Sequence, residues 1–306
     1  MPMNEMTRIK KRNVYRFLRR FAKDISFENL ELMPNHLQGG TSVVFYYQEN
    51  YILKIAKGKG SRVALLKEAK LLEYLNTQKL PVVVAKPTLV HDKGFYAVYS
   101  RIHGHRMSPK TLEGFAPKEQ EAFARSMGAF LSFLHDHKFP DDVMKYVPQA
   151  EDPFEVQLKR TKKKIQFVKE HSAEVDITRW EEKLEGLQDS LDQTWIVTHC
   201  DLRLGHLYSI QGGAERLAVI DFASAQMHDL AVDLSEFAIE LHSDLPEDGL
   251  LAGKIMDMVL KHYQTDDPAI AEKIEFGLLE FEIRRAYQQV RNSLRSKIRS
   301  DFELYS

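Results

Sequence analysis

The sequence of 306 residues has little cysteine and no long apolar run, the features typical of secreted and membrane proteins. Its single cysteine, Cys200, excludes an internal disulfide and is typical of a reducing compartment. No apolar run approaches the roughly 20 residues that cross a bilayer, and the N-terminal segment MPMNEMTRIKKRN is polar. We therefore expect a cytoplasmic protein that has no membrane partner.

Neither sign of charge is in excess. The chain has 43 Lys and Arg residues against 44 Asp and Glu residues, which leaves a formal net charge of −1. A balance of this kind gives no global field that would attract nucleic acid or an anionic membrane, so we expect no nucleic-acid partner. Repeats and low-complexity tracts are also absent, and the length exceeds that of a single core, which indicates one large domain or two lobes.

The N-terminal third alternates between helix and strand patterns. Residues 8–23 predict an amphipathic helix whose basic face is interpreted as solvated surface, with nucleic-acid binding as the alternative. Short β-rich runs predict strands, and apolar residues at helical spacing predict a helix over residues 62–75. The predicted strands cover residues 30–33, 43–47, 51–55, 82–90 and 95–102. We expect a small, mostly antiparallel sheet with one helix packed on it.

After residue 102 the pattern becomes mostly helical. Residues 103–109 are predicted to be the crossing between two lobes, and helices are predicted over residues 117–137, 154–170, 177–191, 234–241, 250–263 and 269–298. The sequence thus predicts an α+β fold with a sheet-containing lobe over residues 1–102 and a helical lobe over residues 103–306.

Most of the ionisable residues that could do chemistry gather in residues 195–225. A short apolar run leads into His199, Cys200 and Asp201, and His206 follows five residues after Asp201. Residues 207–210 and 216–220 predict a hairpin around Gln-Gly-Gly-Ala-Glu. If this hairpin is symmetric about the bond between residues 213 and 214, His206 lies opposite Asp221.

Two aspartates in this stretch have a clear chemical use. Asp201, at the centre of a loop, can accept a proton from an incoming hydroxyl. Asp221 ends the apolar strand LAVID and offers a carboxylate to a hard cation such as Mg²⁺, the alternative being turn formation or helix capping. A further alternative combines these two residues with His199 and His206 as a transition-metal hydrolase site.

The spacing His-x-Asp-x₄-His, followed after a hairpin by Ile-Asp-Phe, resembles the aminoglycoside and macrolide phosphotransferase family, whose fold is kinase-like. That family usually has HGDxxxxN and a later IDF or IDW segment. The resemblance implies that Asp201 is the catalytic base, that His206 and Asp221 hold Mg²⁺, and that His199 is structural. Two residues depart from the family pattern, because Cys200 stands for glycine and His206 for asparagine.

The same resemblance implies a lysine on the third strand and a glutamate on the next helix. Lys54 lies in the apolar strand YILKI, and Glu68 lies on the helix, with Glu73 as the alternative partner. A lysine in an apolar strand is costly to bury unless it is paired, which favours the pair on physical grounds as well. The alternative interpretation is an edge strand from which Lys54 points to solvent.

Further positions follow from the resemblance. A loop that approaches the nucleotide phosphates corresponds to Gly39, Gly40, Thr41 and Ser42, because paired glycines permit close backbone approach. Backbone groups from Ser100 to Ile102 would pair with the nucleotide base. In the segment MHDLAVDLSEF, Asp233 is expected to brace the catalytic loop from behind. His135 is interpreted as a packed or capping histidine rather than a catalytic one.

These residues predict a phosphotransferase that moves the γ-phosphate of ATP or GTP, with Mg²⁺, to a hydroxyl of a small molecule, as a monomer or homodimer. The alternative is a catalytically silent nucleotide-binding relative with a regulatory or structural role. A polycationic aminoglycoside acceptor would need convergent carboxylates, for which Glu240, Asp244, Glu280 and Glu282 are available. The basic run of residues 159–164 would oppose such an acceptor if it faces the cleft, and is otherwise a solvated helix face.

Overall fold

The computed structural model describes residues 16, 25–26, 29–34, 40–150, 154–172, 174–187, 195–210, 216–245, 250–265 and 267–303. The chain forms two compact units, each made of several segments. Unit 1 comprises Met1–Arg106, Phe139–Val147 and Leu207–Ser224, and unit 2 comprises Met107–Lys138, Pro148–His206 and Ala225–Ser306. The units therefore alternate along the sequence, whereas the predicted lobes are two continuous segments.

Unit 1 contains a five-stranded antiparallel sheet in the order β1-β2-β3-β6-β5. Its strands are β1 (Leu30–Leu32), β2 (Ser42–Tyr47), β3 (Tyr51–Ala56), β5 (Pro87–Val90) and β6 (Tyr96–Ser100). Alternate residues of these β-branched and aromatic runs point into one core, which includes Phe45, Leu53 and Val98. Because β3 lies between β2 and β6, Lys54 is on an interior strand, and the edge-strand interpretation is wrong.

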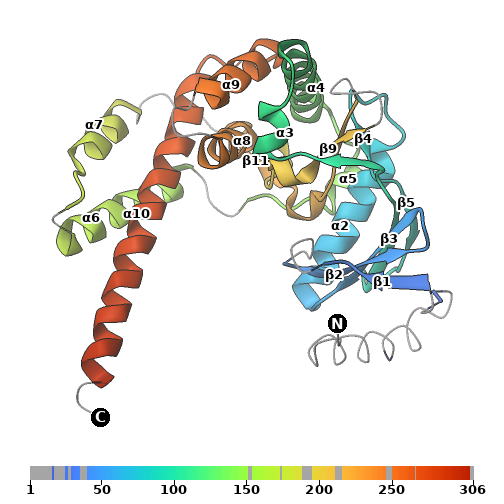
Figure 1. The fold of residues 1–306 in the computed structure, drawn as a ribbon, viewed down its shortest axis with the longest axis horizontal. Coiled ribbons are helices and arrows are strands. Elements are labelled where there is room, and N and C mark those ends of the chain that lie inside the picture. Colours follow the sequence, from blue (N-terminus) through green and yellow to red (C-terminus); the bar gives the residue numbers. More distant parts are fainter. Residues whose placement is uncertain are drawn as a thin grey trace. The chain divides into compact units, whose positions relative to one another are not determined.

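Helix α2 (Lys59–Leu75) packs against this sheet (Figure 1). Its buried stripe contains Leu65, Ala69 and Leu72, which lie three or four residues apart and hence on one side of the helix. Glu68 is on the same side and is 1 % exposed. The sequence pattern that buries α2 therefore also carries a carboxylate toward the sheet.

A second sheet of unit 1 has the order β4-β10-β9-β7. It joins β4 (Val83–Val84), β7 (Gly104–Arg106), β9 (Leu207–Ile210) and β10 (Leu217–Val219). The hairpin register pairs Leu207 with Val219, where the predicted symmetry pairs it with Ile220. The strand also begins only at Leu207, after a 3₁₀ turn over Leu204–His206, so the strand pairing that was to align His206 with Asp221 is wrong.

Unit 2 is mostly helical. Its helices are α3 (Pro109–Glu113), α4 (Pro117–Asp136), α6 (Phe154–His171), α7 (Thr178–Leu187), α8 (Ala231–Asp244), α9 (Leu250–His262) and α10 (Ile270–Glu303). A two-stranded antiparallel pair, β8 (Ile196–Thr198) with β11 (Gln226–His228), precedes α8. Figure 1 shows the long α10 beside α8 and α6, and both contacts are close. α6, α7 and α10 share a core around Val168, Trp180 and Ile283.

Close helix packing in unit 2 depends on small residues. At Gly128 of α4, an added Cβ would lie 2.6 Å from the carbonyl oxygen of Val259 on α9, which is closer than van der Waals contact allows. Glycine thus permits the approach of these two helices, which bury Phe130, Leu134 and Ile255.

The predicted α+β fold is confirmed. The short helices α3 and α5 (Asp141–Met144) and the strands β7, β8 and β11 were not predicted. The predicted helix over residues 8–23 lies outside the described residues, apart from one position. Within the described residues, no helix is both long and apolar enough to cross a membrane.

Candidate active site

Three charged side chains of unit 1 meet at the centre of its first sheet. The Nζ of Lys54 donates to both carboxylate oxygens of Glu68, at 2.8 and 3.0 Å, and to Oδ1 of Asp221 at 2.9 Å. The Glu68 side chain is 2 % exposed, that of Lys54 17 % and that of Asp221 28 %. The structure therefore contains the predicted Lys54–Glu68 pair and adds Asp221 to it. Glu73, the alternative partner, instead pairs with Lys70 at the surface.

The two carboxylates keep Lys54 charged. Burial lowers the pKa of this amine, but the negative charges of Glu68 and Asp221, and their hydrogen bonds, raise it by more, so that the pKa lies above its ordinary value. Tyr99 adds a hydrogen bond from its hydroxyl to Oε2 of Glu68 at 3.3 Å. Glu68 is thus held by two donors, whereas Asp221 is the more exposed of the two carboxylates.

Asp221 occupies an unusual backbone conformation. It follows β10, which ends at Val219, and has φ = 69°. Residues other than glycine rarely adopt positive φ, and they do so mainly where the surroundings or a function require it. The 3₁₀ turn η4 (Phe222–Ser224) comes next and buries Phe222 against α2. This packing fixes the backbone that carries the Asp221 carboxylate.

The predicted nucleotide loop is described only in part. Gly39 lies outside the described residues. Gly40 and Thr41 are exposed, and Ser42 is buried at the start of β2. The carbonyl of Gly40 accepts from Nζ of Lys57 at 3.2 Å, and that of Thr41 accepts from the Lys57 N–H at 3.0 Å. Lys57 therefore holds this loop near β3.

At the predicted hinge, part of the backbone is already bonded within unit 1. The Ser100 N–H donates to the carbonyl of Lys86 at 2.8 Å, and the Ser100 hydroxyl accepts from the Lys86 N–H at 2.8 Å. The N–H of Arg101 donates to the carbonyl of Asn50 at 2.7 Å. The N–H groups of Ser100 and Arg101 are therefore already engaged within unit 1.

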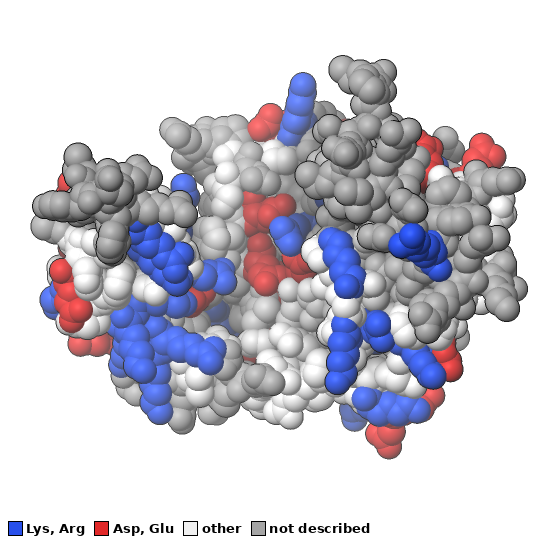
Figure 2. Space-filling model, turned by 90° about the horizontal axis from the view of Figure 1, so that it is seen from below, with Lys and Arg blue, Asp and Glu red and all other residues white. Residues whose placement is uncertain are grey.

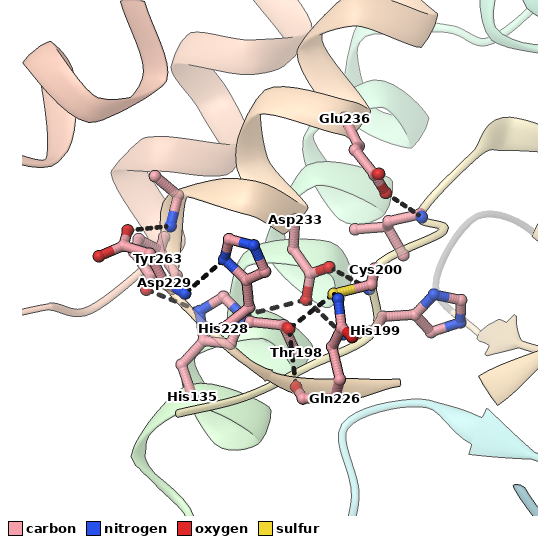
Figure 3. A network of polar contacts seen from close by, with 12 residues as sticks. His135, Thr198, His199, Cys200, Gln226, His228, Asp229, Asp233, Glu236 and Tyr263 are labelled. Atoms are coloured by element: carbon pink, nitrogen blue, oxygen red, sulfur yellow. Dashed lines mark hydrogen bonds and ion pairs between the residues drawn. The ribbon is translucent and has the colours of Figure 1, made fainter. Parts of the chain in front are cut away.

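In unit 2, one buried carboxylate holds the backbone of the loop that follows β8. Asp233, in the first turn of α8, is 0 % exposed and accepts from the N–H of His199 and of Cys200, both at 2.8 Å (Figure 3). Its Oδ2 also lies 3.2 Å from Nε2 of His135. The family resemblance implies that Asp233 braces this loop, and the contacts of Asp233 with the two N–H groups have that geometry.

These donors keep Asp233 ionised. Burial raises the pKa of a carboxyl, but the hydrogen bond from His135 and the interactions with His199 lower it further than burial raises it, so the pKa lies below its ordinary value. His135 in turn contacts the Tyr263 hydroxyl through Nδ1 at 2.8 Å. The residue interpreted from the sequence as a packed histidine is packed, and it also orients the carboxylate that holds the loop.

Cys200, at the position where the resembling family has glycine, has φ = 56°. A side chain in this region is strained, which explains why glycine suits the position. The Cys200 thiol is held by the Thr198 hydroxyl at 2.9 Å and by Nε2 of Gln226 at 3.5 Å. Burial, together with the nearby Asp233 charge, raises the pKa of this thiol to about 12, so it is a structural residue rather than a nucleophile.

Asp201 follows on the braced loop and is partly exposed, with 23 % of its side chain accessible. Nε of Arg203 donates to its Oδ1 at 2.6 Å. The Asp201 carbonyl lies 2.7 Å from Nδ1 of His206, and the Asp201 Oδ2 lies 3.7 Å from the same nitrogen. The loop therefore closes on itself through His206, and the Asp201 carboxylate is oriented by Arg203.

Arg203 and Glu236 were not predicted from the sequence. Oε2 of Glu236 accepts from the N–H of Leu202 at 3.3 Å, directly after Asp201. Burial, and the negative charges of Asp233 and Asp201, raise the pKa of Glu236 to about 7. The signal for Glu236 was its spacing, since it lies three residues after Asp233 and so on the same face of α8.

The predicted residues thus fall into two groups. Unit 1 holds Lys54, Glu68 and Asp221 in direct contact, and unit 2 holds Asp201, His206, His199 and Asp233 around one loop. The first group has the Lys–Glu–Asp set that kinase-like enzymes use for nucleotide phosphates, and the second has an oriented aspartate on a braced loop. Residues 35–269 match the phosphotransferase enzyme family, so the chain belongs to that family.

Solved structures of phosphotransferases have the same fold. The ternary complex of APH(2")-IIa with streptomycin and ATP is 19 % identical and has a TM-score of 0.66, over 96 % of this chain and 94 % of that one. The GDP complex of aminoglycoside 2'-phosphotransferase-IIIa is 16 % identical, with a TM-score of 0.67 and 96 % of each chain covered.

A macrolide phosphotransferase has the same fold as well. Macrolide 2'-phosphotransferase MphH from Brachybacterium faecium is 16 % identical, with a TM-score of 0.60 over 93 % of this chain and 92 % of that one. No curated protein matches the sequence. The predicted family and the predicted kinase-like fold are both confirmed.

Proposed function

We propose that the protein transfers the γ-phosphate of ATP or GTP to a hydroxyl group of a small molecule, with Mg²⁺ as the metal. The observation that carries this proposal is the contact of Lys54 with Glu68 and Asp221. A lysine that bridges a buried and a more exposed carboxylate can exchange the exposed one for a phosphate oxygen while the buried one keeps it in place. The ATP and GDP in two of the similar structures agree with a nucleotide donor.

Of the two side chains that would hold Mg²⁺, one offers the kind of donor atom that a hard cation prefers. Carboxylate oxygen is the ligand that Mg²⁺ prefers, and Asp221, 28 % exposed, offers one. An imidazole nitrogen at His206 is a softer donor than the amide oxygen of the usual asparagine. Since Nδ1 of His206 faces the Asp201 carbonyl, we assign Nε2 as the ligating atom. When bound, Mg²⁺ would neutralise charge on the transferred phosphoryl group.

Asp201 is proposed as the base that orients the acceptor hydroxyl and takes its proton. Its carboxylate is accessible, and its loop is fixed by Asp233 at the two preceding residues. A fixed base is what phosphoryl transfer requires, because this reaction depends mainly on positioning and on charge neutralisation. Arg203 holds Oδ1 of Asp201, and Oδ2 is the oxygen proposed to accept the proton of the acceptor hydroxyl.

The test is nucleotide binding measured by calorimetry, with Mg²⁺ and either ATP or GTP, on the wild type and on Lys54→Met. We expect micromolar binding that needs Mg²⁺ and weakens at least tenfold in the variant. Lys70→Met is the matched control, because Lys70 is a surface lysine of unit 1 on α2 that pairs with Glu73. Equal binding by wild type and Lys54→Met would contradict the proposal.

Turnover and metal analysis separate the alternatives. A screen of hydroxylated acceptors with MgATP and MgGTP should give a phosphorylated product, which mass spectrometry identifies. Nucleotide binding without transfer to any acceptor would instead favour the catalytically silent relative. Stoichiometric, tightly bound zinc in the purified protein would favour the hydrolase interpretation.

A further inference from the structure

The Lys54–Glu68 pair lies in a drier environment than the charged side chains at the surface. Figure 2 shows Lys, Arg, Asp and Glu side chains spread over one face of the molecule, where water solvates them. The Glu68 side chain, by contrast, is 2 % exposed. A buried carboxylate cannot turn to water for its remaining hydrogen bonds, so protein groups must supply them. The groups around Glu68 therefore decide how firmly it holds Lys54.

Tyr99 is the second donor to the Glu68 carboxylate. Its hydroxyl donates at 3.3 Å to Oε2 of Glu68, the oxygen that also accepts from Nζ of Lys54 at 3.0 Å. Tyr99 is itself 3 % exposed. Within the part of the chain that the structure describes, Glu68 is the only hydrogen-bond partner of this hydroxyl. What the hydroxyl does in this structure is thus to hold the Glu68 carboxylate.

The register of β3 and β6 places Tyr99 beside Lys54 as well. The strands pair Lys54 with Ala97 and Ile52 with Tyr99, so Lys54 and Tyr99 are diagonal neighbours on one face of the sheet. The small Ala97 stands directly opposite Lys54 and leaves the space there to the two longer side chains. Nζ of Lys54 lies 5.7 Å from the centre of the Tyr99 ring, within the range of a cation–π interaction. One side chain therefore contacts both members of the pair.

The proposed exchange of partners at Lys54 gives the second donor its importance. Under the proposed function, a phosphate oxygen replaces Asp221 at the Lys54 amine, and Glu68 is the carboxylate that keeps the amine in place. The last torsion of a glutamate side chain is broad, so a single donor leaves the carboxylate plane free to turn. A second donor, the Tyr99 hydroxyl, restricts this rotation.

The Tyr99 hydroxyl can fill this role at any ordinary pH. Burial and the negative charge of Glu68 raise its pKa well above the ordinary value, so it keeps its proton and stays a donor. The phenol ring is held between β3 and β5, because β6 lies between these strands in the sheet. The donor is thus fixed in position before any ligand binds.

We propose that Tyr99 is a positioning residue of the nucleotide site, whose hydroxyl fixes the Glu68 carboxylate and thereby holds Lys54 for the phosphates. This inference rests on the proposed function and adds a residue to the same site. It requires no contact between Tyr99 and the nucleotide. The rival role is a direct contact, because Tyr99 immediately precedes Ser100–Ile102, the segment that the family resemblance assigns to the nucleotide base.

The first test removes the hydroxyl alone. Tyr99→Phe keeps the ring and should weaken calorimetric binding of ATP or GTP with Mg²⁺ by about threefold or more, because the carboxylate loses a donor while the packing remains. Tyr96→Phe is the matched control. It removes the same atom from another buried tyrosine of β6, but Tyr96 belongs to the core on the other face of the sheet. The control should stay within about twofold of the wild type. Equal affinities of Tyr99→Phe and the wild type, or equal losses in both variants, would overturn the inference.

The second test shows whether Tyr99 acts through Lys54. In the Lys54→Met background, Tyr99→Phe should change the nucleotide affinity by less than about twofold, because the amine that Glu68 positions is absent. A direct contact of Tyr99 with the nucleotide, or a general loss of packing, would weaken binding by the same factor in both backgrounds. Equal factors would therefore contradict the positioning role, even where Tyr99→Phe weakens binding in the wild-type background.

Urea unfolding tests the contact with Glu68 in the absence of nucleotide. Tyr99→Phe should raise the unfolding equilibrium constant about threefold or more in the wild type. In Lys54→Met/Glu68→Leu, where the hydroxyl has lost its acceptor, the same change should raise the constant by less than about twofold. Equal effects in the two backgrounds would show that Tyr99 does not hold Glu68.

Failure of this inference can be told apart from failure of the proposed function. If the wild type binds nucleotide and Tyr99→Phe binds it equally well, the role of Tyr99 is wrong and the proposed function stands. Absence of nucleotide binding in the wild type would overturn the proposed function and, with it, the role of Tyr99.

Discussion

The two groups of site residues are held by different means. In unit 1, the Lys54 amine contacts the carboxylates of both Glu68 and Asp221, and Asp221 is partly exposed. In unit 2, the loop that carries Asp201 is held by its backbone, through N–H groups that donate to the buried Asp233. Under the proposed function, the first arrangement can change partners when the nucleotide and Mg²⁺ bind, whereas the backbone contacts of the second arrangement need no ligand. The difference indicates where the protein tolerates rearrangement and where it does not.

The largest effect on stability is expected at Asp233. Asp233→Ala leaves the N–H groups of His199 and Cys200 and the ring of His135 without their buried acceptor, which should cost about 3–5 kcal/mol of unfolding free energy. Urea unfolding measures it. Asp257→Asn, an exposed acid on α9, is the control and should change the free energy by less than about 0.5 kcal/mol. Equal effects of both changes would show that Asp233 does not brace the loop.

Lys54 should give a smaller loss of stability that a second change can recover. Lys54→Met leaves Glu68 buried without its cation, at a cost of roughly 2–4 kcal/mol. Lys54→Met/Glu68→Leu removes the unpaired carboxylate and should regain at least half of that loss, without restoring nucleotide binding. A double variant less stable than Lys54→Met would mean that Glu68 is held by contacts other than Lys54.

Glu236 should make stability depend on pH. Its pKa of about 7 in the folded protein exceeds the ordinary 4.5, so the folded state binds the proton more tightly. The raised pKa therefore contributes on the order of 1–3 kcal/mol to the free energy of unfolding. This contribution is complete below pH 4.5 and is lost as the pH rises to about 7. Unfolding curves of the wild type and Glu236→Gln should therefore diverge with pH over this window. Parallel curves would argue against the raised pKa.

The smallest effect concerns the backbone at Cys200. Cys200→Gly and Cys200→Ala both remove the sulfur, but only glycine accepts φ = 56° without strain, so the glycine variant should be more stable by about 0.5–1 kcal/mol. In the wild type, the raised pKa predicts that iodoacetamide alkylates Cys200 at least about a hundredfold more slowly than free cysteine at pH 8. An alanine variant as stable as the glycine variant would show that the loop relaxes around the side chain.

The Lys54–Glu68 pair could be predicted because the family resemblance implies a lysine on the third strand and a glutamate on the next helix, and local rules support the pair. A lysine in an apolar strand needs a buried partner, and the spacing of Leu65, Ala69 and Leu72 shows which face of α2 is buried. The α+β class followed from the same periodicities. Such inferences need only the residues of one strand or one helix.

What the sequence did not show depends on register and on distant contacts. A hairpin loop of given length allows more than one register, and the one adopted pairs Leu207 with Val219 rather than with Ile220. Arg203 and Glu236 acquire a role only in the folded loop. There Arg203 contacts the Asp201 carboxylate, and Glu236 of α8 accepts from the N–H of Leu202. The core that α6 and α10 share needs these helices side by side, although 98 residues separate the end of α6 from the start of α10.

The most direct measurement compares turnover and nucleotide affinity in Asp201→Asn, with an acceptor found in the screen. The unit 2 loop is proposed to supply the base and unit 1 to hold the nucleotide, so the rate of γ-phosphate transfer should fall by about 10²–10⁴. The affinity for MgATP or MgGTP should stay within about twofold of the wild type. Unchanged turnover, or a loss of nucleotide binding as large as in Lys54→Met, would contradict this division of roles.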